Sequence, residues 1–382
     1  MFHRPLIVSG LIVSTLCGGA VASASPSYIV TDLGSLPGRY STVARAINEK
    51  GQIVGESYGA DGPRAFIYSG GAPIRDLLVS SESQSFANEI NNSGQVVGQV
   101  AIPGSGRHAY LYGSDGSVKD LGTLGEGTTS AGLSINDAGT IVGGAWTDEI
   151  ISHIHAFEYR DSGPMQDLGT LGGTYSVAND INESGQIVGM AYTADGIERA
   201  YLYDDIEHMQ DLGTLGGPSS IAEGINNLGQ IVGGAAVNDF EFHPFLYSGS
   251  GQMQDLGILP GQSFGHAYAI NDSGLIVGGS RDADGRWHAF LYRDSAMVDL
   301  NDLIDPTNGL WFNNALDINN LGQIVGYGQD SSGQTRALLL TPVPEPSAVV
   351  HLSLAAACLI ACAWRSRKNY ENLGRQATSA SK

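Results

Sequence analysis

A pattern of apolar and polar positions recurs along most of the chain. Each copy has an Ile-Asn pair, a Gly three residues after the Asn, and an apolar run ending in Val-Gly. The Ile residues are 43, 45, 46, 44, 45 and 48 residues apart, at Ile47, Ile90, Ile135, Ile181, Ile225, Ile270 and Ile318. A period in this range is typical of propellers and other repeat arrays.

Four stretches of each copy have the character of a β-strand. They read Ala-x-x-Ile, Gln-Ile-Val-Gly, His-Ala-Phe-Leu-Tyr and Met-x-Asp-Leu-Gly, the first two joined at Asn-x-x-Gly. Asn tolerates left-handed backbone angles and Gly supplies positive φ, so that junction predicts a tight turn. Four antiparallel strands per copy predict the blade of a β-propeller in an all-β chain.

The two ends of the repeat predict a closed ring. Tyr28–Gly34 matches a fourth strand with no third strand before it, and the last copy stops at its third strand, Arg336–Leu340. We therefore predict that residues 25–342 form a seven-bladed propeller whose last blade is completed by the N-terminal strand. A β-solenoid is the alternative, although solenoids normally have shorter repeats and capping units.

The repeat also resembles a known family. The triplet His-Ala-Phe opens the third strand at His155 and at His288, and variants of it occur in the other copies. On these residues the chain resembles the HAF repeat family between residues 28 and 340. The resemblance implies extracellular repeat modules without a shared chemistry.

Charged residues recur at two positions of the repeat. A His or Arg opens every third strand, and an Asp ends every fourth strand 11 or 12 residues later. The predicted cross-strand pairs are Arg64 with Asp76, His108 with Asp120, His155 with Asp167, Arg199 with Asp211, His243 with Asp255, His288 with Asp299, and Arg336 with Asp32. We interpret them as structural, because Arg replaces His and does not ligate metals or readily act as a base.

No constellation of residues predicts catalysis or a cofactor. Ser-His-Asp, metal-ligand and phosphate-loop patterns are absent from the sequence, and Asp-rich turns such as 282–285 lack the spacing of a calcium loop. The non-repeated aromatic residues remain as speculative ligand contacts, since aromatic rings beside carboxylates suit sugars. They are Trp146, Phe240, Phe242, Trp287 and Trp311.

The first 24 residues have the three parts of a secretory signal. Arg4 gives a positive start, Leu6–Val21 is apolar, and Ala22 and Ala24 form a small-x-small cleavage site. All three cysteines lie outside residues 25–342, so the exported body is predicted to be free of disulfides.

A second apolar segment, Ala348–Trp364, is long enough for a transmembrane helix across a thin membrane. It follows Pro344, Glu345 and Pro346 and precedes the basic residues Arg365, Arg367 and Lys368 and a polar tail, 369–382. This order resembles the PEP-CTERM sorting signal of residues 343–368. The resemblance implies transient insertion in the inner membrane, processing by an exosortase, and a final place at the surface or in the matrix of a Gram-negative bacterium that makes exopolysaccharide.

The charge of the predicted body narrows the choice of partner. Residues 25–342 hold 13 Lys and Arg against 37 Asp and Glu, a net charge of −24. The negative electrostatic field of such a charge disfavours binding to nucleic acid and to anionic membranes. The sequence therefore favours a non-catalytic surface protein that contacts exopolysaccharide or other surface proteins. A secreted lyase or glycosidase with paired carboxylates in the central funnel is the alternative, and a purely structural spacer is a third.

Overall fold

The computed structural model describes residues 27–78, 84–148, 153–160, 163–206, 208–249 and 251–343. These residues form 28 β-strands and two short 3-10 helices, η1 (Leu300–Leu303) and η2 (Pro306–Asn308). No α-helix occurs in these ranges, so the predicted all-β class is confirmed. None of their helices is long and apolar enough to cross a membrane.

The strands lie in five sheets, three of four strands and two of eight. Each eight-stranded sheet consists of two antiparallel groups of four joined by a single parallel bridge, so that every copy of the repeat corresponds to one antiparallel group of four strands. Groups one to three are β2 (Ser41–Ile47), β3 (Ile53–Gly59), β4 (Gly62–Tyr68), β5 (Arg75–Asp76); β6 (Ser85–Ile90), β7 (Val96–Ile102), β8 (Gly106–Tyr112), β9 (Val118–Asp120); and β10 (Ser130–Ile135), β11 (Ile141–Trp146), β12 (Ile154–Tyr159), β13 (Gln166–Asp167). Groups four to six are β14 (Gly172–Ile181), β15 (Ile187–Thr193), β16 (Glu198–Asp204), β17 (His208–Asp211); β18 (Ser220–Ile225), β19 (Ile231–Ala236), β20 (Phe242–Tyr247), β21 (Gln254–Asp255); and β22 (Gln262–Ile270), β23 (Ile276–Asp282), β24 (Trp287–Arg293), β25 (Ala296–Asp299). The seventh group is β26 (Leu310–Ile318), β27 (Ile324–Asp330), β28 (Thr335–Pro342) and β1 (Tyr28–Asp32).

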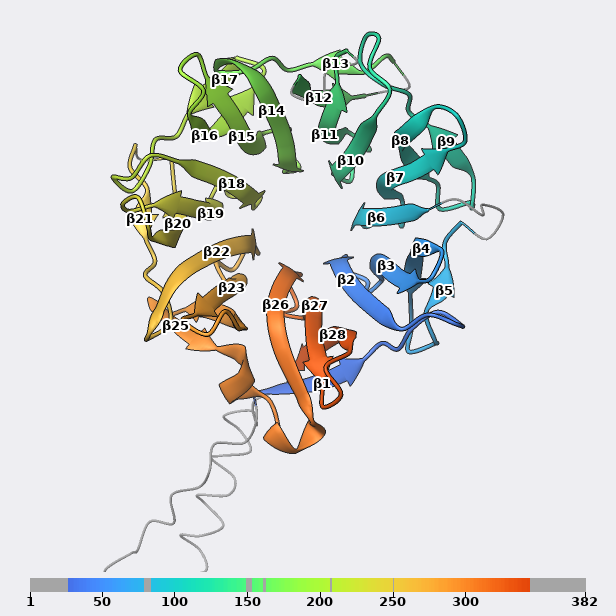
Figure 1. Cartoon of the computed structure of the whole chain (residues 1–382), viewed down its shortest axis with the longest axis vertical. Coiled ribbons are helices and arrows are strands. Elements are labelled where there is room, and N and C mark those ends of the chain that lie inside the picture. The colour runs from blue at the N-terminus through green and yellow to red at the C-terminus, as the bar shows by residue number, and fades with distance from the viewer. Residues whose placement is uncertain are drawn as a thin grey trace, which may run out of the picture.

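The groups stand around a central axis, with the first strand of each group innermost (Figure 1). The blue β1 lies beside the red β28, and the two pair antiparallel from Tyr28 opposite Pro342 to Asp32 opposite Leu338. A solenoid would hold these strands at opposite ends of the array, so the solenoid alternative is wrong.

A closed circle of hydrogen bonds joins the innermost turns. Each Asn of the repeated Ile-Asn pair accepts backbone N–H bonds within its own turn and donates its Nδ2 to the backbone oxygen of the next Asn, at 3.0–3.2 Å. The circle runs through Asn48, Asn91, Asn136, Asn182, Asn226, Asn271 and Asn319 and returns to Asn48. All seven residues are buried. The repeated Asn therefore shapes the turn and also links neighbouring groups.

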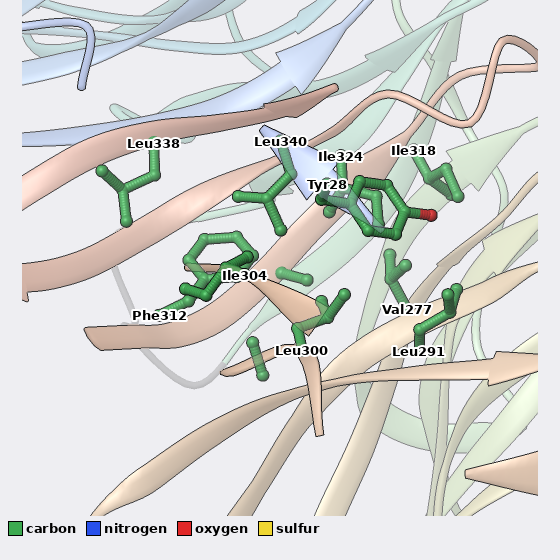
Figure 2. Close-up of a cluster of buried hydrophobic side chains, with 12 residues drawn as sticks. Tyr28, Val277, Leu291, Leu300, Ile304, Phe312, Ile318, Ile324, Leu338 and Leu340 are labelled. Carbon is green, nitrogen blue, oxygen red and sulfur yellow. The ribbon is translucent and has the colours of Figure 1, made fainter. Parts of the chain in front are cut away.

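Apolar side chains pack between neighbouring groups in seven clusters of described residues. Figure 2 shows the cluster between the sixth and seventh groups, where Val277 and Leu291 face Phe312 and Leu340. Tyr28 of β1 packs into the same cluster, so the N-terminal strand contributes to the core as well as to the sheet. Burial of apolar surface of this kind stabilises a protein by about 25 cal/mol per Å².

The alternating strand directions give the ring two edges. The Asn-x-x-Gly turns lie on one edge, here called the turn edge. The connections between second and third strands, and those between groups, lie on the opposite edge, here called the loop edge. The start of every third strand and the end of every fourth strand therefore lie at the loop edge.

Candidate functional site

The structure brings the four predicted His-Asp pairs together at the loop edge. The His Nδ1 atom lies 2.7–2.9 Å from an Asp Oδ2 atom in each of them: His108 with Asp120, His155 with Asp167, His243 with Asp255, and His288 with Asp299. The other oxygen of each Asp accepts the backbone N–H two residues further along the chain. Each Asp thus holds a turn and an imidazole together, which is the geometry of a structural pair.

The arginine pairs are looser. The distances from Arg to Asp oxygen are 3.4 Å for Arg64 with Asp76 and 3.5 Å for Arg199 with Asp211. Arg336 meets Asp32 across the ring closure at 4.0 Å, and its closer partner is Asp330 on β27, at 2.7 Å. The strands therefore meet as predicted, but the main ion pair of Arg336 is a different one.

Aromatic side chains gather along the loop edge of groups five to seven. The rings of Phe242 and Phe264 stack with centroids 5.6 Å apart, and Phe264 meets Trp287 edge-on at 5.8 Å. The indole N–H of Trp311 donates to the backbone oxygen of Trp287 at 2.9 Å, and all four rings are half-buried. We call Phe242, Phe264, Trp287 and Trp311 the aromatic strip.

Two arginines cover parts of this strip. The guanidinium of Arg281 lies 5.4 Å from the ring centroid of Phe264 and 5.8 Å from that of Trp287, and Arg286 lies 5.3 Å from that of Trp311. Cation–π contacts at exposed sites contribute about 0.5–1 kcal/mol each. They hold the rings in place while leaving the arginine N–H groups at the surface.

The two other candidate aromatic residues lie apart from the strip. Phe240 precedes β20 and is 90% exposed. Trp146 lines a mainly apolar cavity of about 180 Å³ between groups three and four, together with Ile154, Tyr175 and Val177. The structure thus brings three of the five sequence candidates together and adds Phe264, which the sequence analysis missed.

A second feature is a cavity of about 240 Å³ on the central axis, lined by residues of all seven groups. Every innermost strand has a β-bulge between its repeated Ala or Gly and its Ile. A bulge places two residues of one strand opposite one residue of its partner and redirects side chains. The polar lining residues at these bulges are Arg45, Asn88, Glu89, Asn179, Asp180, Glu223, Tyr268 and Asp317.

Carboxylates dominate this lining. Burial raises the pKa of Asp180 to about 6 and the pKa values of Asp317 and Glu223 to about 7. Burial, together with repulsion from Asp317 and Asp180, also raises the pKa of Glu89 well above its usual value. Both oxygens of Asp317 accept backbone N–H bonds, from Ile47 and Ile318, and those of Asp180 accept N–H bonds from Ile181 and Ile225. Each of these two aspartates therefore links its own innermost strand to the innermost strand of the next group.

Direct metal ligation has no candidate here, since no cluster of three or more His, Cys, Asp or Glu in the described ranges is arranged to hold a metal ion. The sequence signal for the cavity was the pair of variable positions inside Ala-x-x-Ile.

The predicted terminal signals lie outside the described residues. They comprise the cleavage residues Ala22 and Ala24, the predicted helix over residues 348–364, and the sorting residues Pro344, Glu345, Pro346, Arg365, Arg367 and Lys368.

Comparisons with known proteins identify the fold. No protein-family model matches the sequence, and no curated protein sequence is significantly similar to it. The structure is similar to the beta-propeller domain of the Trilobed protease from Pyrococcus furiosus, described as having an open velcro topology (TM-score 0.53, 9% identity, 79% of this chain and 95% of that one). It is also similar to puromycin hydrolase (TM-score 0.50, 13% identity, 80% of this chain) and to TolB from Acinetobacter baumannii (TM-score 0.44, 13% identity, 81% of this chain).

The chain spans 54% of the length of puromycin hydrolase and 65% of the length of TolB. At identities this low the similarity concerns the architecture alone. Combined with the ring of antiparallel strand groups, it shows that the chain has the β-propeller fold.

Proposed function

We propose that this protein is a secreted, surface-sorted, non-catalytic module that binds extracellular polysaccharide through the aromatic strip. Its scaffold is a closed propeller of seven blades. The seven groups of four strands, the seven clusters between them and the circle of seven asparagines support this number.

The aromatic strip is the observation that carries the proposal. Pyranose rings present apolar C–H faces with hydroxyl groups around their rims, so flat aromatic rings flanked by polar groups suit them. The strip offers four half-buried rings from three groups, with the guanidinium groups of Arg281 and Arg286 beside them as donors. Its length across three groups favours a chain of sugars over a single residue.

The proposed cellular location rests on the two ends of the sequence. The secretory signal and the resemblance of residues 343–368 to a PEP-CTERM signal favour export, transient insertion in the inner membrane and processing by an exosortase. The resemblance to HAF repeats favours the same extracellular setting. A polysaccharide at the cell surface of a Gram-negative bacterium is the ligand available there.

The test is to measure binding of the purified protein to the producer's exopolysaccharide by tryptophan fluorescence and by calorimetry. We expect Trp287→Ala and Trp311→Ala each to weaken binding about tenfold, which corresponds to about 1.4 kcal/mol for a contact at the centre of an interface. Trp146→Ala is the matched control, because Trp146 lies in a separate cavity. Failure to bind any glycan or surface fraction, or an equal loss in the Trp146→Ala variant, would overturn the proposal.

A secreted lyase or glycosidase is the second candidate, and the carboxylates of the central cavity favour it. A raised pKa near neutrality is typical of catalytic acids. The backbone bonds made by both oxygens of Asp180 and Asp317 favour a structural role for these two residues. New reducing ends or unsaturated products formed from the polysaccharide by wild-type protein, and lost in Glu223→Gln, would establish the enzyme.

A further inference from the structure

The polar groups of the central cavity present acceptors to its interior, while most of their donors are already used. The side-chain amide of Asn88 donates to the backbone oxygen of Gly132, and that of Asn179 donates to the backbone oxygen of Ala222, both at 2.8 Å. Arg45 forms a two-pronged ion pair with Glu56, its Nε atom lying 3.0 and 3.1 Å from the two carboxylate oxygens. Both oxygens of Asp180 and Asp317 already accept backbone N–H bonds, Oε1 of Glu89 accepts that of Ile90, and Oε2 of Glu223 accepts the amide of Asn179 at 3.3 Å. The oxygen atoms of the two asparagine side chains and Oε1 of Glu223 therefore remain as the main acceptors for a ligand.

His266 lies directly behind the lining of the cavity, beside Glu223 and Tyr268, and has an unsatisfied ring nitrogen. Its side chain is 89% buried and the whole residue 91% buried, yet its Nδ1 atom has no hydrogen-bond partner in the described part of the chain. That atom faces Glu223, whose Oε1 lies 3.7 Å away, too far for a hydrogen bond. An unpaired buried acceptor or donor costs about 1–3 kcal/mol. A ligand donor placed between His266 and Glu223 would satisfy both.

The surroundings fix the imidazole in this position. The ring of His266 stacks on Phe242 at 4.7 Å and lies 6.1 Å from the ring of Tyr268, whose side chain lines the cavity. Gly234 leaves the necessary space, because a Cβ atom there would come within 2.6 Å of the His266 ring. Burial lowers the pKa of His266 to about 4, so the ring is neutral at pH 7, and in the tautomer that carries its proton on Nε2 the Nδ1 atom is an acceptor.

Size and charge together define the ligand. A cavity of about 240 Å³ is smaller than the roughly 300–1,000 Å³ of pockets for drug-sized ligands and so holds one small molecule. Burial disfavours the charged forms of these carboxyl groups, and a cation bound beside them would favour the charged forms. The donors of an ammonium group can reach separated acceptors, whereas a directly bound metal ion needs clustered ligands, which the described residues do not provide.

We propose that the central cavity binds a small organic cation with a primary ammonium group, such as an unacetylated amino sugar, and that Glu223 is the main partner of this group. His266 and the side-chain oxygen of Asn179 complete its surroundings. His266 also contacts Phe242 and Phe264 of the aromatic strip, whereas Glu223 belongs to the cavity lining. The Glu223→Gln variant therefore distinguishes this proposal from polysaccharide binding at the strip, which Trp287→Ala and Trp311→Ala test.

The test is calorimetric titration of the purified protein with glucosamine, N-acetylglucosamine and calcium chloride at pH 7. We expect glucosamine to bind and N-acetylglucosamine, which lacks the positive charge, to bind at least tenfold more weakly. Glu223→Gln should weaken glucosamine binding at least tenfold. Glu126→Gln, the same substitution at an exposed loop position, should leave it unchanged.

A second measurement keeps the test independent of folding defects. Glucosamine should raise the melting temperature of wild-type protein and of Glu126→Gln, since a ligand that binds only the folded state stabilises it. It should not raise that of Glu223→Gln. Equal binding of the two sugars, an unchanged affinity in Glu223→Gln, or binding of calcium alone would overturn the proposal.

Discussion

Replacement of Asn319 by Ala removes the link of the asparagine circle that joins the last repeat to the first. The Nδ2 atom of Asn319 donates to the backbone oxygen of Asn48 at 3.1 Å and to Oε1 of Gln323 at 2.9 Å. Its Oδ1 accepts the backbone N–H groups of Leu321 and Gln323 at 3.1 and 3.0 Å. The substitution therefore deletes four hydrogen bonds made by a residue that is 3% exposed.

The expected loss follows from these four bonds. A typical hydrogen bond contributes about 1 kcal/mol net, so Asn319→Ala should reduce the free energy of unfolding by about 3–4 kcal/mol. For a body of this size, with about 2.1 cal/mol/K of unfolding entropy per residue, that is a fall of roughly 5 °C in melting temperature. The assay is calorimetry or circular dichroism on heating.

Two further variants make the result specific. Asn226→Ala deletes the equivalent four bonds within the circle and should cost the same, although its partner Asn271 is only 45 residues away in sequence. Asn320→Ala, at the exposed neighbouring position, should cost less than 1 kcal/mol, since its bonds to Asp272 lie at the surface. A cost for Asn319→Ala as small as that for Asn320→Ala would refute the closed circle.

Three further predictions concern the cavity acids, the closing strand and the sorting signal. The cavity acids Glu89, Asp180, Glu223 and Asp317 have raised pKa values in the folded state, so the stability they contribute is complete below about pH 4 and is lost as the pH rises through 6 to 7. We therefore expect the melting temperature to fall between pH 4 and pH 7, and to fall less in Glu89→Gln. A melting temperature that increases over this range would contradict the prediction. Deletion of Tyr28–Gly34 should leave the edge of β28 unpaired and promote aggregation, measured by light scattering; a monomer as stable as the wild type would contradict it. Substitution of Glu345 by Ala should abolish processing and surface retention in the producer, and recovery of the wild-type protein with an intact tail would disprove the sorting proposal.

The ring was predictable because its determinants are local and repeated. Turn chemistry at Asn-x-x-Gly, strand alternation and the missing strand at each end all specify the same arrangement. The circle through Asn48 and its six counterparts explains why the Asn recurs, but the contact with the next group is not visible in a single copy. Similarly, the preference of Arg336 for Asp330 depends on side-chain reach across β27, which the spacing does not reveal.

Carboxylates in the central funnel were considered from the sequence, but the residues that line the cavity were not identified, because β-bulges break the alternation of the innermost strands. A regular strand would place only one of Asn179 and Asp180 toward the axis, whereas both line the cavity. In every group at least one of the two variable positions lines the cavity, while the flanking Ala and Ile residues pack in the clusters between groups. The aromatic strip was recovered in part, because Phe264 lies in an innermost strand and reaches the loop edge only through the fold.

Closure of the ring by β1 and β28 is the claim on which the strip and the cavity both depend, and a disulfide tests it most directly. Ile29 lies opposite Thr341 in the paired strands, is 58% exposed, and belongs to a body predicted to contain no cysteine. The double variant Ile29→Cys with Thr341→Cys should form an intramolecular disulfide on mild oxidation, seen as loss of both free thiols in a monomer. Ile29→Cys with Ile206→Cys, two exposed positions on different groups, should not. Free thiols in the first variant, or cross-linking only between molecules, would contradict the closed propeller.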